Sequence, residues 1–378
     1  MRTPEGVTAA MTLIRSDLRL AIAMSAALRR DSCASTAAAP YQVLSHLHYL
    51  HLVDYESRKF LGAIGERLPV RVHDDVAAAS RNSFKLLNQR GGNGVVDTLR
   101  EFTREADLQR SWFLENNRAP SLIRRLPMLS RLVQDSFIVL YDGNLLCTSQ
   151  SATFHARLRP GSPRQALLDR SRELGENLRA LADICDVRMG DDYWAGWRPS
   201  SVEVKDASWS VLYRQMFPGI DPALAMALGI LEVGLVSLRL MGELAPSNSP
   251  LGPSAFKLRF VGVWQILQTL EEISVGGWAY LSSAKRGRLD ELLEGDEACL
   301  LRTSGARRLR NNLMHYGIHH DDVENLTSGD ELLGLTELHL GGLGWVTVDR
   351  LVGGCIDAII PLLEEWQGDY RDALVEPH

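Results

Sequence analysis

The most apolar stretch of the chain, residues 223–244, is long enough either to cross a membrane or to form the core of a helical bundle. It carries three charged residues, Glu232, Arg239 and Glu243, and it is interrupted by Gly229 and Gly234. Charged side chains are costly at the centre of a bilayer. The sequence therefore favours a buried core helix over a membrane span, and we expect a protein that does not associate with membranes.

Further segments with apolar residues at helical spacing lie at 255–281 and 351–366, and a more polar one lies at 296–316. Together with 223–244 they would form an antiparallel four-helix bundle. Between the last two helices, two short apolar runs flank the glycine-rich segment 341–344. This pattern predicts a small β-hairpin inserted into the bundle.

The first 136 residues show only helical periodicity, which predicts an all-α N-terminal region. Its expected helices span 7–28, 41–68, 74–87, 95–113 and 119–136. A short β-hairpin with Asp142 and Gly143 at its turn follows, and we expect it to be peripheral. Ser162 and Pro163 then begin a helix that continues to about Val187.

Residues 190–201 are rich in Gly, Pro, Ser and Trp and lack helical periodicity, so we interpret them as a linker. The sequence thus predicts a mainly α protein of two domains. Residues 1–198 would form a mainly helical domain that positions substrate or regulates activity, and residues 199–378 would form a helical bundle.

The composition narrows the function classes. A net charge of −6 argues against a large basic surface that coats nucleic acid, although a small local basic site is compatible with it. The 5 cysteines contain no C-x-x-C pair, which supports neither a disulfide framework nor a zinc ribbon. Three charged residues, Arg15, Asp17 and Arg19, interrupt the apolar N-terminal stretch, unlike a secretory signal. We therefore expect a cytoplasmic protein.

The most specific pattern is the run from Arg310 through Asn311 to His315, in a basic segment. On a helix, Asn311 and His315 share one face, and Arg308, seven residues before His315, lies on that face too. Arg310 lies about 140° round the helix from His315, within reach of a phosphate through its long side chain. The sequence leaves open whether Arg308, Arg310 or both would hold that phosphate.

These residue types suit RNA cleavage without a metal. An imidazole can accept or donate a proton near neutral pH, a guanidinium can hold a phosphate with two hydrogen bonds, and an amide can orient either group. The nucleophile would be the 2′-hydroxyl of the RNA itself. Such chemistry needs no cofactor, and we expect none.

The pattern Arg-Asn-x-x-x-His on a late helix of a four-helix bundle resembles the signature of HEPN domains, over about residues 206–370. The resemblance implies a metal-independent endoribonuclease that leaves a 2′,3′-cyclic phosphate. It also implies a homodimer in which the motif helices of two subunits form one composite cleft. The setting that it implies is a toxin–antitoxin or anti-phage defence system, with an antitoxin or regulatory protein as a further partner.

The expected catalytic residues are Arg310, Asn311 and His315. In this hypothesis His315 is the general acid or base, Arg310 holds the phosphate with Arg308 as a partner, and Asn311 orients the histidine or the substrate. The residues expected to bind substrate are Arg307, Arg308, Tyr316 and His319.

Two alternatives stay open. The motif residues could form only a solvated basic helix end, with a purely structural helical protein around them. The same groove could belong to a non-catalytic HEPN-like module that binds a nucleotide or a protein.

Other residue groups are weaker candidates. We interpret His46, His48 and His51 as helix surface rather than as a metal site. We expect residues 285–288 to form a basic loop and residues 319–322 to form a polar loop. The arginines between 118 and 131 are expected to form a solvated helix face. We assign Trp264 to the core. No phosphate-binding loop, serine nucleophile elbow, zinc helix or Rossmann glycine signature is present in the sequence.

Overall fold

The computed structural model is mainly helical and contains a small three-stranded antiparallel sheet. This confirms the mainly α class. The residues that the structure describes are 4–26, 43–68, 77–80, 99–100, 103–104, 107, 136–156, 164–188, 193–194, 197, 201–276, 281–318, 322, 330–371 and 374.

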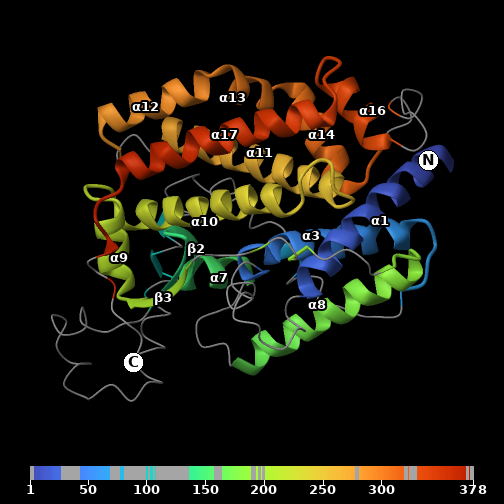
Figure 1. Ribbon diagram of the computed structural model, residues 1–378, viewed down its shortest axis with the longest axis horizontal. Helices are drawn as coiled ribbons and strands as arrows, with labels where there is room; N and C mark the ends of the chain where they lie inside the picture. The colour runs from blue at the N-terminus through green and yellow to red at the C-terminus, as the bar shows by residue number, and fades with distance from the viewer. Residues whose placement is uncertain are drawn as a thin grey trace.

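Helix α10 (Pro222–Leu244) lies at the centre of the molecule, with helices above it and the sheet and N-terminal helices below it in Figure 1. Asp221 caps its first turn, because Oδ1 of Asp221 accepts a hydrogen bond from the backbone N–H of Ala223 at 2.9 Å. The helix is apolar and long enough to span a membrane, yet 89% of its most apolar window is buried inside the protein. The core-helix prediction is confirmed, and a soluble protein is consistent with it.

Two long helices, α11 (Gly252–Gly276) and α17 (Trp345–Trp366), pack against α10 and against each other. Shorter helices cover this trio: α12 (Ser283–Glu294), α13 (Asp296–Leu301), α14 (Ser304–His315) and α16 (Glu331–His339). The helix predicted at 296–316 is therefore two helices. The first helix ends at Arg302. The side chain of Thr303 then caps the start of α14, because it accepts a hydrogen bond from the backbone N–H of Ala306 at 3.2 Å.

The prediction of a β-hairpin around 341–344 is wrong. The segment expected as its first strand lies in helix α16, which Asp330 caps, and the segment expected as its second strand lies at the start of α17. Gly341 and Gly342 have φ values of 65° and 85°, so they do reverse the chain, but between two helices. The basic loop predicted at 285–288 is also wrong, because these residues form the first turns of α12 behind the N-cap Ser282.

The sheet has the order β2-β1-β3, with strands β1 (Ser136–Tyr141), β2 (Asn144–Thr148) and β3 (Val202–Ala207). Asp142 and Gly143 connect β1 to β2 with positive φ values of 47° and 79°, which confirms the predicted hairpin turn. The N-terminal half is thus not all-α.

We expected the hairpin to be peripheral, but it is part of the core. Ile138, Val139 and Leu146 are fully buried, and β2 packs against α10. Strand β3 pairs antiparallel with β1 from the other side. The sheet therefore joins chain segments from both sides of the boundary predicted at 198/199.

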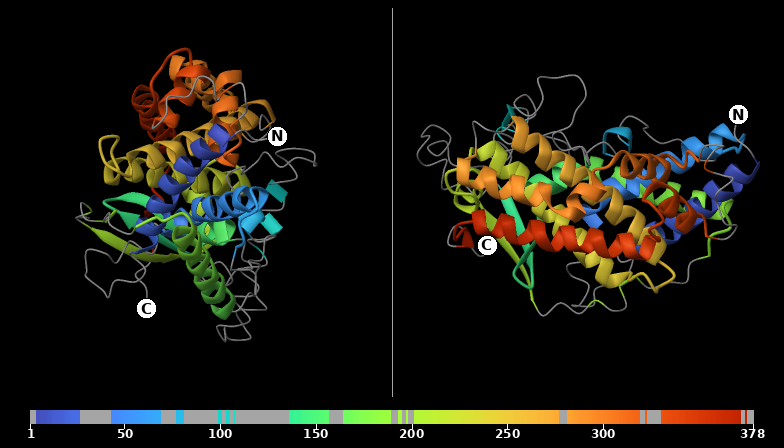
Figure 2. Two further views of the ribbon diagram at one scale, coloured as in Figure 1. Left: turned by 90° about the vertical axis from the view of Figure 1, so that its right-hand side faces the viewer. Right: turned by 90° about the horizontal axis from the view of Figure 1, so that it is seen from above.

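The N-terminal helices form a layer beside the sheet, which the two views of Figure 2 show from other sides. They are α1 (Pro4–Ala26), α3 (Leu47–Ala63), α7 (Ser149–Ala156) and α8 (Arg164–Ile184), and α9 (Trp209–Met216) leads from β3 into α10. Helix α1 contacts α3, α8, α11 and α16, so it bridges the two layers. The helices predicted at 7–28, 41–68 and from Ser162 are confirmed, whereas most of 74–136 lies outside the described residues.

Candidate functional site at the end of helix α14

Helix α14 presents the motif residues on two opposite sides. Leu309 and Leu313 are buried, which fixes the inward face of the helix. The helix ends after His315, because Tyr316 adopts the left-handed conformation with φ 49°. His315 therefore lies at the C-terminus of the helix, where the helix dipole favours a positive charge.

The ring of His315 spans the boundary between the interior and solvent. Its side chain is 41% exposed, and its Nδ1 lies 3.1 Å from Oε1 of Glu56, a residue of α3 whose side chain is 1% exposed. Nδ1 itself is buried but makes no aligned hydrogen bond, so its contact with Glu56 is one of close approach. The exposed part of the ring lies away from Glu56. Nε2 is then the nitrogen that can meet a substrate, while the carboxylate faces the other nitrogen.

Arg310 is buried against α11 rather than exposed. Its guanidinium lies over the ring of Trp264 at 5.0 Å, and its Nη1 donates to Oδ1 of Asn311 at 2.9 Å. With the Gln265 amide oxygen turned toward it, Nε donates to that oxygen at 3.1 Å. Because its donors are used in this way, Arg310 is placed to orient Asn311 and to join α14 to α11.

Two other arginines of the motif helix, Arg307 and Arg308, are exposed. Arg308 also lies near His339 of α16, whose pKa is lowered mainly by burial and further by the charge of Arg308, against the opposite effect of Asp322. The structure thus brings Arg308, Asn311 and His315 together on the outer face of α14. Of the two arginines left open by the sequence, Arg308 is the accessible one.

Tyr316 is fully enclosed, and its hydroxyl donates to Oδ2 of Asp17 at 2.6 Å. Burial and the neighbouring Asp17 raise its pKa well above 10, so the hydroxyl stays protonated. The side chain of Phe60 meets the tyrosine ring edge-on at 6.4 Å. Tyr316 thus fastens the end of α14 to α1 and α3. The other predicted contact residue, His319, lies outside the described residues.

A buried charged network contacts Tyr316, the residue that follows His315. Asp17 of α1 forms an ion pair with Lys257 of α11, and both side chains are at most 2% exposed. Ser254 donates to Oδ1 of Asp17 at 3.0 Å, and Lys257 Nζ lies 4.0 Å from the centre of the Tyr316 ring. Burial lowers the pKa of Lys257, and the charge of Asp17 opposes that shift. This network holds α1, α11 and the end of α14 at fixed positions.

Sequence reasoning missed Glu56, Asp17 and Lys257 as parts of this region. The helical pattern of the sequence could have indicated that these three residues are buried. Glu56 follows Val53 by three residues and precedes Phe60 by four, so it occupies an apolar-face position of its helix. Asp17 and Lys257 occupy similar positions in α1 and α11. A charged residue at such a position is buried and needs a partner.

His46, His48 and His51 are buried, so their interpretation as helix surface is wrong. The ring of His48 stacks on His155 of α7 at 4.0 Å, and its pKa is lowered mainly by burial and then by neighbouring histidines. Within the described residues, no group of three His, Cys, Asp or Glu side chains converges as a metal site.

Comparison of the chain with protein-family models, with curated protein sequences and with solved structures gives no match. The arrangement of residues around α14 is therefore the basis on which a function can be assigned.

Proposed function

We propose that the protein is a metal-independent endoribonuclease of the HEPN type. The observation that carries the proposal is the placement of His315, with Nδ1 close to the buried carboxylate of Glu56 and a partly exposed ring on the helix face that also carries Arg308 and Asn311. A carboxylate close to an imidazole stabilises the positive charge that develops when the ring takes a proton.

In the proposed reaction, Nε2 of His315 accepts the proton of the RNA 2′-hydroxyl, and the 2′-oxygen attacks the adjacent phosphorus. The bond to the 5′-oxygen of the next nucleotide breaks, and that oxygen takes a proton from an acid. The products are a 2′,3′-cyclic phosphate and a 5′-hydroxyl. The guanidinium of Arg308 holds the phosphate and stabilises its developing charge, while Asn311, fixed by Arg310, orients the substrate.

The resemblance to HEPN domains leads us to propose a homodimer as well. The motif helices of two subunits would face each other, and the second His315 would supply the acid. The same proposal includes a messenger or transfer RNA as the substrate. It also includes a role as a toxin or anti-phage effector, with an antitoxin or regulatory protein as a partner. A monomer in sedimentation of the wild-type chain at micromolar concentration would contradict the composite site.

The test is cleavage of total transfer RNA and of a folded messenger in the presence of EDTA. We expect wild-type protein to leave cyclic phosphate ends and His315→Ala to lose about 10²–10⁴-fold in rate. Arg308→Ala should lose cleavage strongly, and Glu56→Gln, which keeps an oxygen beside Nδ1 but removes its charge, should lose less than His315→Ala.

The matched control is Arg214→Ala, which removes an exposed arginine from α9. It should cleave like the wild type, because α9 lies far from α14 (Figure 1). Full activity in folded His315→Ala would refute the assignment of the site.

A second candidate function is a non-catalytic HEPN-like module that binds a nucleotide or a protein in the same groove. The burial of Arg310 favours it, because this arginine of the motif does not face solvent. Tight RNA binding by folded, dimeric wild-type protein, without cleavage products and with loss of binding in Arg308→Ala, would support this function over the nuclease.

A further inference from the structure

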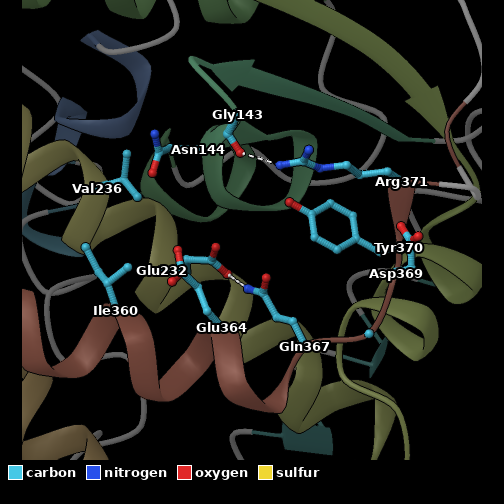
Figure 3. Close-up of a pocket in the computed structure, with 11 residues that line it drawn as sticks. Gly143, Asn144, Glu232, Val236, Ile360, Glu364, Gln367, Asp369, Tyr370 and Arg371 are labelled. Atoms are coloured by element: carbon cyan, nitrogen blue, oxygen red, sulfur yellow. Dashed lines mark hydrogen bonds between the residues drawn. The ribbon is translucent and has the colours of Figure 1, made fainter.

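A cavity of about 280 Å³ lies at the C-terminal end of α17, whereas α14 packs with α16 near the other end of that helix. Four segments line it: α10, α17, the chain at 367–371 and the turn between β1 and β2. Figure 3 shows Glu232, Glu364 and Tyr370 around this space, with Arg371 reaching across it to the hairpin turn. None of these residues belongs to the site at α14.

Glu232 is a buried carboxylate without a cationic partner among the described residues. Its side chain is 5% exposed, and Gln367 Nε2 donates to its Oε2. The nearest guanidinium in the lining, that of Arg371, donates instead to the carbonyl oxygen of Gly143 at 3.0 Å. Burial, and secondarily the charge of Glu364, raises the pKa of Glu232 to about 7, although the hydrogen bond from Gln367 opposes the shift.

The lining indicates the chemistry of a ligand. Three acids, Glu232, Glu364 and Asp369, line the cavity together with one base, Arg371, so the lining favours positive charge. Within the described residues these carboxylates do not converge as a group that could hold a metal ion. Apolar side chains of Val236 and Ile360 form another part of the wall.

We propose that this cavity binds a small aliphatic amine, with its ammonium group between Glu232 and Glu364 and its alkyl chain against Val236 and Ile360. The amine supplies the positive charge that Glu232 lacks. It would also connect α10 with the C-terminal segment, because both contribute to the cavity wall.

The proposal predicts a pH dependence of binding. The titratable and charged groups around Glu232, beside the amide of Gln367, are Glu364 of α17, Tyr213 of α9 and, in the C-terminal segment, Asp369, Tyr370 and Arg371. Burial raises the pKa of both tyrosines, that of Tyr370 to about 12, so neither ionises near neutral pH. Ionisation of Glu232 should therefore strengthen binding by roughly tenfold between about pH 6 and about pH 8, while an alkylammonium keeps its charge.

Calorimetric titration of the full chain with n-butylamine tests the proposal, beside n-butanol as a neutral probe of the same shape and Mg²⁺ as a metal probe. We expect heat of binding from butylamine alone. Glu232→Gln and Glu364→Gln should each weaken it by at least about tenfold. The control is Glu365→Gln on α17, the helix that carries Glu364. Glu365 pairs with Arg288 at 3.4 Å and does not line the cavity.

Glu232→Gln is expected to fold, because it removes a buried charge, and thermal unfolding checks this. Absence of binding by butylamine, equal binding by butanol, or equal weakening by Glu365→Gln would each overturn the proposal. Binding of Mg²⁺ that depends on Glu232, without binding of the amine, would overturn the amine and indicate a cation site of another kind.

Discussion

At the scale of single residues, the molecule buries charges at positions where its helical pattern expects apolar side chains. Asp17 and Lys257 illustrate this, since each is almost fully enclosed and each is the other's counter-ion. A buried ion pair adds little net stability, because both ions lose their hydration, but breaking it leaves one charge uncompensated.

We therefore predict that Lys257→Met destabilises the protein by about 3–5 kcal/mol, because Asp17 stays buried without its cation. The double variant Asp17→Leu with Lys257→Met should recover part of that loss. Urea denaturation of the single and double variants measures the free energies of unfolding. Additive losses in the double variant would contradict a coupled pair.

Residue spacing predicted the outer face of α14 but not the role of each arginine on it. Arg308, Asn311 and His315 share a face by helical geometry alone. The burial of Arg310 depends on Trp264 and Gln265, which lie on another helix more than forty positions earlier in the chain. Glu56 likewise reaches His315 only through the packing of α3, which no local pattern specifies.

At the scale of elements, long periodic segments were predictable and turns were ambiguous. The helices at 223–244 and 351–366 follow from their apolar spacing, because burial of one face drives helix packing. The glycines at 341 and 342 indicate positive φ correctly, yet positive φ serves helix and strand connections alike. Elsewhere, the side chains of Asp330 and Thr303 cap the first turns of α16 and α14 and mark where these helices begin.

A close helix contact leads to a prediction at this scale. A Cβ atom at Gly305 of α14 would overlap the backbone carbonyl oxygen of His339 in α16, whereas one at Gly287 of α12 would meet nothing. We expect Gly305→Ala to destabilise the protein by about 1–3 kcal/mol through overpacking. Gly287→Ala should stabilise it by about 0.5–1 kcal/mol through helix propensity. Thermal and urea unfolding compare the two, and equal effects would contradict the close contact.

At the scale of the whole molecule, the helical layers enclose titratable groups that the unfolded chain would expose. His48 is buried against His155 and Tyr49, and its pKa lies well below 6.5. Above about pH 6.5 the residue is neutral in both states and contributes no pH dependence. As the pH falls below that value, the unfolded chain binds a proton that the folded protein does not.

The free energy of unfolding should therefore fall below about pH 6.5, by up to about 1.4 kcal/mol per pH unit for this group. His48→Phe keeps an aromatic ring and removes the titration, so its stability should change less between about pH 7.5 and about pH 5.5. Urea denaturation of both proteins at the two pH values measures the difference. An identical loss in wild type and variant would exclude His48 as the cause.

The pairing of β1 with β3 bears on how such a chain can be inherited. A gene that encoded residues 199–378 alone would supply β3 and α10 without β1, β2 and the helices that cover them. It would leave an unpaired strand edge and an apolar helix in water, which favours aggregation. We therefore expect the two halves to be inherited together in one gene.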